Sequence, residues 1–195
     1  MIGQQSDGQP GLPANFPRRI VLTGFMGAGK STVGRLLAER LAWRLMDVDS
    51  QIESSQGMTI TEIFKQMGEA HFRELEHQTI RELLHTDHLI LALGGGAFED
   101  DRTRDLLHRH SGTQVIHLEV SLPTVLERCK GTEDVRPVLA NHAQLGARYD
   151  RRLPLYRQAH RTIGVDFLTP DAVVETILGG LSSESPLLPD PAIRT

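Results

Sequence analysis

Residues 24–31 read Gly24-Phe25-Met26-Gly27-Ala28-Gly29-Lys30-Ser31 and match the phosphate-binding pattern G-x-x-x-x-G-K-[ST] at every fixed position. They follow an apolar stretch at 19–23 that predicts a strand, and they precede residues 32–40, which predict a helix. Glycines let the backbone wrap a phosphate closely, and backbone N–H groups and the helix dipole then face the anion. The alternative is a glycine-rich turn that carries a surface lysine. The context favours a nucleotide-binding loop.

Two side chains of this loop have expected chemical roles. Lys30 is expected to reach the β- and γ-phosphates of the nucleotide, and the Ser31 hydroxyl is expected to hold Mg²⁺. The predicted nucleotide contacts in the loop are Gly27, Ala28, Gly29, Lys30, Ser31 and Thr32.

Composition narrows the class of protein. The chain has 195 residues, which suits one domain, with 39% hydrophobic and 24% charged residues, as in an ordinary globular protein. A formal net charge of −4 without a basic stripe argues against nucleic acid as a main partner. The single cysteine, Cys129, excludes an intramolecular disulfide and suits a reducing compartment. No apolar run is long enough to span a bilayer, and residues 1–17 lack the features of a signal or transit peptide. We therefore expect a cytoplasmic enzyme.

Strand and helix patterns alternate along the chain. Strands are expected at 18–23, 43–47, 88–93, 114–119 and 161–165, and the main helices at 30–42, 69–85, 101–110, 122–130, 143–160 and 170–181. A capping box at 59–62 predicts a shorter helix that Gly68 breaks, and Pro154 predicts a kink. The pattern predicts a three-layer α/β/α domain with a five-stranded parallel sheet.

The domain is expected to span residues 18–181. Residues 1–17 are predicted to be a disordered leader and residues 182–195 a flexible tail. The polar stretch at 131–142 is predicted to be a mobile loop. A monomer is expected, because no strongly apolar surface segment is visible.

Three features fall at the carboxyl ends of predicted strands, where open α/β sheets bind their ligands. They are the phosphate loop, the pair Asp47 and Asp49, and the run Gly94-Gly95-Gly96. If the extended backbone persists, the two aspartates point the same way and could supply one carboxylate near Mg²⁺ and one proton acceptor. The alternative for the pair is a strand end followed by a helix N-cap. For the glycines, the alternatives are a close approach of ligand to backbone and a tight turn without a ligand.

Arg73 lies on the predicted helix at 69–85 between Glu69 and Glu76. Helix-surface ion pairs explain this spacing as well as an arginine that Glu76 orients to grip a carboxylate, and local spacing does not separate the two interpretations. Arg136 and Arg152 could each be solvated arginines if taken alone.

Together these residues resemble the shikimate kinase family over roughly residues 19–181. The resemblance rests on G-F-M-G-A-G-K-S-T-V-G at 24–34, D-V-D at 47–49, F-R-E-L-E at 72–76, G-G-G-A at 94–97, R-P-V-L at 136–139 and R-L-P-L-Y at 152–156. It implies ATP- and Mg²⁺-dependent phosphorylation of the 3-hydroxyl of shikimate, on the route to the aromatic amino acids. It also implies a nucleoside-monophosphate-kinase-like fold with strand order 2-3-1-4-5.

The resemblance also implies roles for single residues. Substrate contacts would be Asp49, Arg73, Gly95, Gly96 and Arg152, with the two arginines flanking the carboxylate and with Phe64 and Phe72 near the ring. Asp49 would accept or orient the hydroxyl proton, Asp47 and Ser31 would serve the metal, and Lys30 and Arg136 would stabilise the transferring phosphoryl group. The substrate-binding region would cover about 48–76 and the lid about 131–142.

The chain departs from the family near the adenine. Cys129 stands where some members carry an arginine, and Arg128 or Lys130 could substitute for it. Two other functions compete with the shikimate kinase interpretation. One is a different small kinase of the same type, such as a gluconate kinase; the other is a non-catalytic nucleotide-binding relative. The presence of Lys30, Asp49 and Arg136 favours catalysis.

Overall fold

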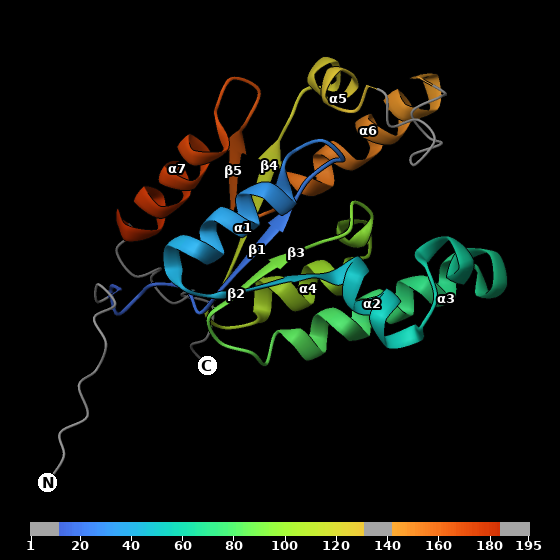
Figure 1. Cartoon of the computed structure of the whole chain (residues 1–195), viewed down its shortest axis with the longest axis horizontal. Helices are drawn as coiled ribbons and strands as arrows, with labels where there is room; N and C mark the ends of the chain where they lie inside the picture. The colour runs from blue at the N-terminus through green and yellow to red at the C-terminus, as the bar shows by residue number, and fades with distance from the viewer. Residues whose placement is uncertain (1–11, 131–141, 184–195) are drawn as a thin grey trace, which may run out of the picture.

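The computed structural model describes residues 12–130 and 142–183. Within them, five parallel strands form one sheet in the order β2-β3-β1-β4-β5. This confirms the expected fold class and strand order (Figure 1). The strands are β1 (Arg19–Thr23), β2 (Arg44–Asp47), β3 (Leu89–Ala92), β4 (Thr113–Glu119) and β5 (Arg161–Gly164).

The central strands are apolar because helices cover both faces of the sheet. Every residue of β1 and of β3 is buried, as expected for continuous apolar runs in a parallel sheet. Outer strand β2 is partly exposed along its length. The core therefore lies along the middle of the sheet, directly beneath the loops that follow β1 and β3.

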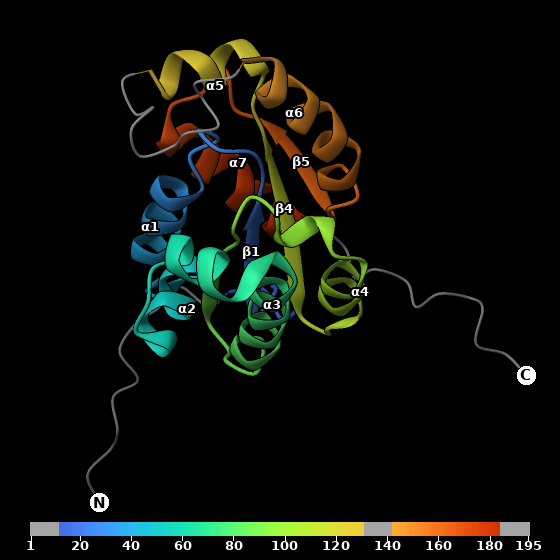
Figure 2. The same cartoon turned by 90° about the vertical axis from the view of Figure 1, so that its right-hand side faces the viewer.

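Helices lie on both faces of the sheet. Helices α1 (Lys30–Leu41) and α7 (Pro170–Ser183) pack side by side over one face, while α3 (Ile60–Leu83) and α4 (Asp101–Arg109) lie over the other (Figures 1 and 2). The remaining elements are α2 (Val48–Gln56), η1 (Ala97–Glu99), α5 (Leu122–Arg128) and α6 (His142–Tyr156). Helix α2 packs against α3, and α6 packs against η1.

Local signals account for most of the helix boundaries. Thr59 and Glu62 form the predicted capping box at the start of α3. Gly68 has φ 82° and ψ 168°, so it breaks that helix with a kink as predicted. Pro154 lies inside α6, which ends two residues later at Tyr156 rather than near residue 160 as the sequence pattern had indicated.

One local prediction was wrong. Asp49 does not continue an extended strand, because helix α2 begins at Val48, directly after Asp47. Asp47 is the N-cap, and its Oδ1 accepts a hydrogen bond from the Ser50 N–H at 3.1 Å. The N-cap alternative is therefore correct for Asp47, and Asp49 sits in the first turn of the helix.

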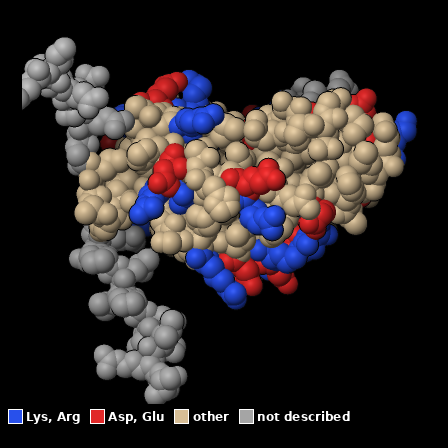
Figure 3. Space-filling model, turned by 90° about the horizontal axis from the view of Figure 1, so that it is seen from below, with Lys and Arg blue, Asp and Glu red and all other residues tan. Residues whose placement is uncertain are grey.

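Charged side chains alternate in sign on the surface that Figure 3 shows. Ion pairs also join neighbouring helices, such as Arg102 of α4 with Glu74 of α3 at 2.9 Å. Among the residues that the structure describes, no helix combines the length and apolar character needed to cross a membrane.

Candidate active site

The phosphate loop joins β1 to α1. Gly27 and Gly29 have φ values of 74° and 90°, which L side chains rarely adopt, so the glycines of the motif are required by the backbone. Gly29 is the N-cap of α1 and makes no side-chain capping bond, so the first N–H groups of α1 face the crevice without a side-chain cap. Lys30 Nζ donates to the carbonyls of Gly24 (2.8 Å) and Phe25 (3.1 Å), which holds the ammonium over the loop.

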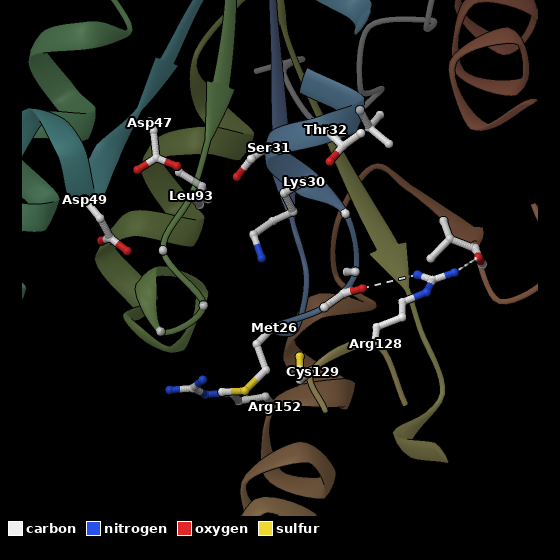
Figure 4. Close-up of a pocket in the computed structure, with 18 of the residues that line it drawn as sticks. Met26, Lys30, Ser31, Thr32, Asp47, Asp49, Leu93, Arg128, Cys129 and Arg152 are labelled. Carbon is white, nitrogen blue, oxygen red and sulfur yellow. Dashed lines mark hydrogen bonds between the residues drawn. The ribbon is translucent and has the colours of Figure 1, made fainter. Parts of the chain in front are cut away.

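A crevice of about 1070 Å³ opens at the carboxyl ends of the strands. The phosphate loop, both aspartates and the glycine run all line it, as the sequence predicted for this edge of the sheet. Figure 4 shows the polar ends of Lys30, Ser31, Asp47 and Asp49 directed toward one space. The predicted site residues that line the crevice are Gly27, Ala28, Gly29, Lys30, Ser31, Thr32, Asp47, Asp49, Gly95, Gly96 and Arg152.

Asp49 is partly buried beside several charges. Burial raises the pKa of its carboxyl above the usual value near 3.8, and the neighbouring Asp47 carboxylate raises it further. The cations Lys30 and Arg73 oppose this rise. A carboxyl group with a raised pKa is a stronger base when ionised, which suits a group that accepts or orients a proton.

Arg73 lies on α3 and is held by two carboxylates. Its Nη1 donates to Glu76 Oε2 at 2.6 Å, and its Nη2 donates to Glu69 Oε1 at 3.2 Å. The Glu76 side chain is only 2% exposed, whereas that of Glu69 is 69% exposed. The buried pair therefore fixes the arginine, and a pure surface ion pair does not describe it.

The glycine run after β3 is a turn pressed against these side chains. A Cβ on Gly94 would lie 2.7 Å from Asp49 Oδ1 and 2.9 Å from Glu76 Oε1. A Cβ on Gly96 would lie 2.6 Å from Arg73 Nη1. Real Cβ contacts are almost never this short, so glycine lets the functional side chains approach the backbone.

Arg152 reaches the same turn from α6. Its Nη1 lies 3.4 Å from the position of a Cβ on Gly95, and its Nε donates to Glu99 Oε1 at 2.7 Å. The Tyr156 hydroxyl donates to the Gly95 carbonyl at 2.5 Å, and burial raises the pKa of this tyrosine to about 12, so it remains a donor. Arg73 thus approaches the turn at Gly96, and Arg152 approaches it at Gly95.

A second cavity of about 440 Å³ adjoins the crevice, and we call it the arginine pocket. Phe64, Arg148 and Arg152 line both cavities. Phe72 packs behind Phe64, with ring centroids 4.7 Å apart, and is itself buried. The lining residues of the arginine pocket are Phe64, Glu69, Arg73, Glu99, Arg148, Arg151 and Arg152.

The far end of the crevice is lined by Cys129 and by residues that follow β5. Cys129 is buried, and its Sγ lies 3.1 Å from the position of a Cβ on Gly27. Arg128 donates to the carbonyls of Gly27 (3.2 Å) and Val165 (2.8 Å), and Figure 4 draws these bonds. Arg128 therefore ties the phosphate loop to the segment after β5.

The oxygen donors present suit Mg²⁺. The Ser31 hydroxyl and the Asp47 carboxylate both face the crevice, and Oδ1 of Asp47 is the atom that caps α2. Among residues 12–130 and 142–183, no group of three or more His, Cys, Asp or Glu side chains forms a metal cage. Mg²⁺ in kinases commonly takes one or two protein oxygens and completes its shell with phosphates and water, so this donor set fits.

Arg136 and residues 131–141 of the predicted lid lie outside the described residues. Two residues that line the arginine pocket, Arg148 and Glu99, were not predicted from the sequence. Arg148 was detectable in principle, because it precedes Arg152 by four residues on one helix and so shares its face. Glu99 had no local signal, since it meets Arg152 across 53 positions of sequence.

Comparison with known proteins decides the family. The family model described as shikimate kinase matches residues 26–182. The shikimate kinase of Persephonella marina is 42% identical over 163 residues, which cover 83% of this chain and 98% of the relative. The chain belongs to the shikimate kinase family.

Other family members agree with this assignment. The shikimate kinase of Rhodococcus erythropolis is 42% identical over 171 residues, covering 85% of this chain and 98% of the relative. A solved structure of the Acinetobacter baumannii enzyme in complex with shikimate has a TM-score of 0.73 and 36% identity, and the match covers 85% of this chain and 94% of that chain. A gluconokinase from Sinorhizobium meliloti has a TM-score of 0.57 at 22% identity, with 86% and 93% covered, which reflects a shared fold alone.

Proposed function

We propose that this chain transfers the γ-phosphate of ATP to the 3-hydroxyl of shikimate, giving shikimate 3-phosphate and ADP in the synthesis of aromatic amino acids. The observation that carries the proposal is the approach of Arg73 to Gly96 and of Arg152 to Gly95, with both arginines lining one cavity. Two arginines converging there suit one carboxylate, and Asp49 and the phosphate loop lie in the adjoining crevice.

The phosphate loop binds the nucleotide in this proposal. The N–H groups of residues 27–32 face its phosphates, and Lys30 moves from the loop carbonyls that it now contacts to the β- and γ-phosphates. Ser31 would hold Mg²⁺ directly and Asp47 would act on it through water, and the ion would supply positive charge against the phosphates. Lys30 then stabilises the charge on the group being transferred.

Asp49 orients the attacking hydroxyl and accepts its proton. Its carboxylate lies beside the glycine turn, within the space that Lys30 and Asp47 also face. Arg73 and Arg152 hold the substrate carboxylate, which places the ring against Phe64. This arrangement supplies positioning and electrostatic stabilisation, which dominate catalysis of phosphoryl transfer.

Further parts of the proposal lie beyond the described contacts. Arg136 closes over the phosphates as part of a lid at 131–142, and the substrate-binding region spans 48–76. The working domain is 18–181, flanked by a leader at 1–17 and a tail at 182–195. The protein acts as a cytoplasmic monomer without nucleic-acid or membrane partners; the formal net charge of −4 argues against a nucleic-acid partner, and the face seen in Figure 3 mixes both signs of charge.

The test is an assay of ADP release with shikimate and gluconate offered side by side, in the presence of ATP and Mg²⁺. We expect turnover with shikimate and little with gluconate, which lacks a rigid ring to place between Phe64 and the glycine turn. Preference for gluconate would support the competing kinase. A folded protein that binds ATP and turns over neither substrate would support a non-catalytic relative.

A further inference from the structure

The arginine pocket has an excess of positive charge in a chain whose formal net charge is −4. Among the described residues, Arg73, Arg148, Arg151 and Arg152 line it, against the two carboxylates Glu69 and Glu99. The pocket is therefore built to receive an anion.

Arg148 differs from the other three arginines in its partners. Arg73 is paired with Glu76 and Glu69, and Arg151 and Arg152 share Glu99 at 3.0 and 2.7 Å. Arg148 is partly buried, and within the part of the chain that the structure describes it forms no hydrogen bond or ion pair. A partly buried guanidinium that lacks a partner loses hydration without compensation, so an anionic ligand in the pocket would stabilise it.

The position of Arg148 indicates which anion it would bind, the carboxylate of the substrate or a phosphate of the nucleotide. Arg148 and Arg152 are four residues apart on α6 and therefore lie on one face of the helix. They also share the boundary between the crevice and the arginine pocket, whereas the phosphate-loop residues line the crevice alone. Arg148 thus lies beside Arg152 in the arginine pocket, where the proposed function places the substrate carboxylate, although it also borders the crevice that the phosphate loop lines.

We propose that Arg148 is a third carboxylate-binding arginine, and that it sets the affinity and selectivity of this enzyme for an anionic substrate. This inference rests on the proposed function, and it adds a residue to the substrate contacts named there. Since Arg148 contacts the carboxylate and not the reacting hydroxyl, it contributes to substrate binding and leaves the phosphoryl-transfer step unchanged.

The experiment measures steady-state constants for Arg148→Gln, Arg148→Lys and Arg109→Gln. Arg109 lies on α4 with its side chain 83% exposed and lines neither cavity, so its replacement removes the same net charge outside the pocket. We expect Arg148→Gln to raise KM for shikimate about tenfold, because the variant loses one charge-assisted contact with the substrate. The values of kcat and of KM for ATP should not change. Arg148→Lys should recover most of the affinity, and Arg109→Gln should behave as the wild type.

A substrate analogue without the carboxylate tests whether Arg148 acts through that group. The analogue in which a primary alcohol replaces the carboxylate should show the same kcat/KM with wild type and with Arg148→Gln. The inference is overturned if KM for shikimate stays within twofold, if KM for ATP rises instead, or if the alcohol analogue loses as much as shikimate does. Lack of wild-type turnover with shikimate would overturn the proposed function and the inference together, whereas an active wild type with an unaffected variant overturns the inference alone.

Discussion

Arg73 and Glu76 form a 2.6 Å ion pair in which the carboxylate is almost completely buried. Burial raises the pKa of Glu76 from 4.5 to about 7, and the attraction of Arg73 opposes that rise. Its Oε1 has no hydrogen-bond partner among the described atoms and lies 2.9 Å from the position of a Cβ on Gly94. A buried carboxylate held this closely orients Arg73 toward the glycine turn.

Replacing Glu76 tests this orientation. Glu76→Gln should raise KM for shikimate roughly tenfold, because Arg73 loses the charged partner that fixes its guanidinium. Glu69→Gln is the matched control, since it removes the exposed partner of the same arginine and should cost little. Equal effects of the two variants on KM would show that the buried pair does not position Arg73.

Gly96 is predicted to be required for space alone. Its φ of −103° is open to alanine, but the added Cβ would displace the guanidinium of Arg73. Gly96→Ala should therefore raise KM for shikimate at least about tenfold and lower Tm, because displacing the guanidinium weakens its buried pair with Glu76. Gly164→Ala, where no atom lies within 4 Å of the new Cβ, should leave both quantities unchanged. Normal shikimate binding by Gly96→Ala would contradict the close approach.

The lowered pKa of His117 should make the free energy of unfolding depend on pH. Burial lowers the pKa of His117 to about 4; Glu119 opposes this shift, and Arg157 and Lys30 reinforce it. Between about pH 6.5 and 4 the unfolded chain binds a proton at this residue and the folded chain does not, so stability falls as pH falls, by at most about 1.4 kcal/mol per pH unit.

The measurement compares urea unfolding of wild type and His117→Gln at pH 4.5, 5.5 and 6.5. The raised pKa of Glu76 contributes the opposite slope to both proteins, so the difference between them isolates His117. The free-energy difference between the two proteins should shift in favour of His117→Gln as pH falls. A difference that stays constant over this range would contradict the assignment.

Substitutions of Asp49 and Asp47 are expected to change different kinetic quantities. Asp49→Asn should lower kcat by about 10²–10⁴-fold while ATP binding survives, the usual range for loss of a general base. Asp47→Asn should instead shift activity to higher Mg²⁺ concentrations. Titrating Mg²⁺ against kcat for both variants decides the roles, and rescue of the Asp49 variant alone by excess Mg²⁺ would reverse them.

Local sequence signals predicted the parts of the fold that depend on local chemistry. The phosphate loop, the buried strands, the capping box at Thr59 and the break at Gly68 all follow from a few neighbouring residues. The start of α2 could not be predicted in this way, because an Asp-x-Asp sequence fits both a strand end and a helix N-cap. The strand order came from the family resemblance, since alternation alone does not order strands.

The sequence predicted many of the residues that line the crevice, but it missed Arg148 and Glu99 and did not settle how the side chains pair. Spacing placed Glu69 and Glu76 equally near Arg73, and only tertiary packing distinguishes the buried partner from the exposed one. The Tyr156 bond to the Gly95 carbonyl spans 61 positions, and no local pattern indicates it.

The most direct test of the central claim is the identity of the product. Wild-type protein would be incubated with ATP, Mg²⁺ and shikimate, and the phosphorus–proton couplings of the product would be read by NMR. We expect a single phosphoester on the 3-oxygen, with one ADP formed per ester. Phosphate on another hydroxyl, or ADP formed together with free inorganic phosphate and no ester, would contradict it.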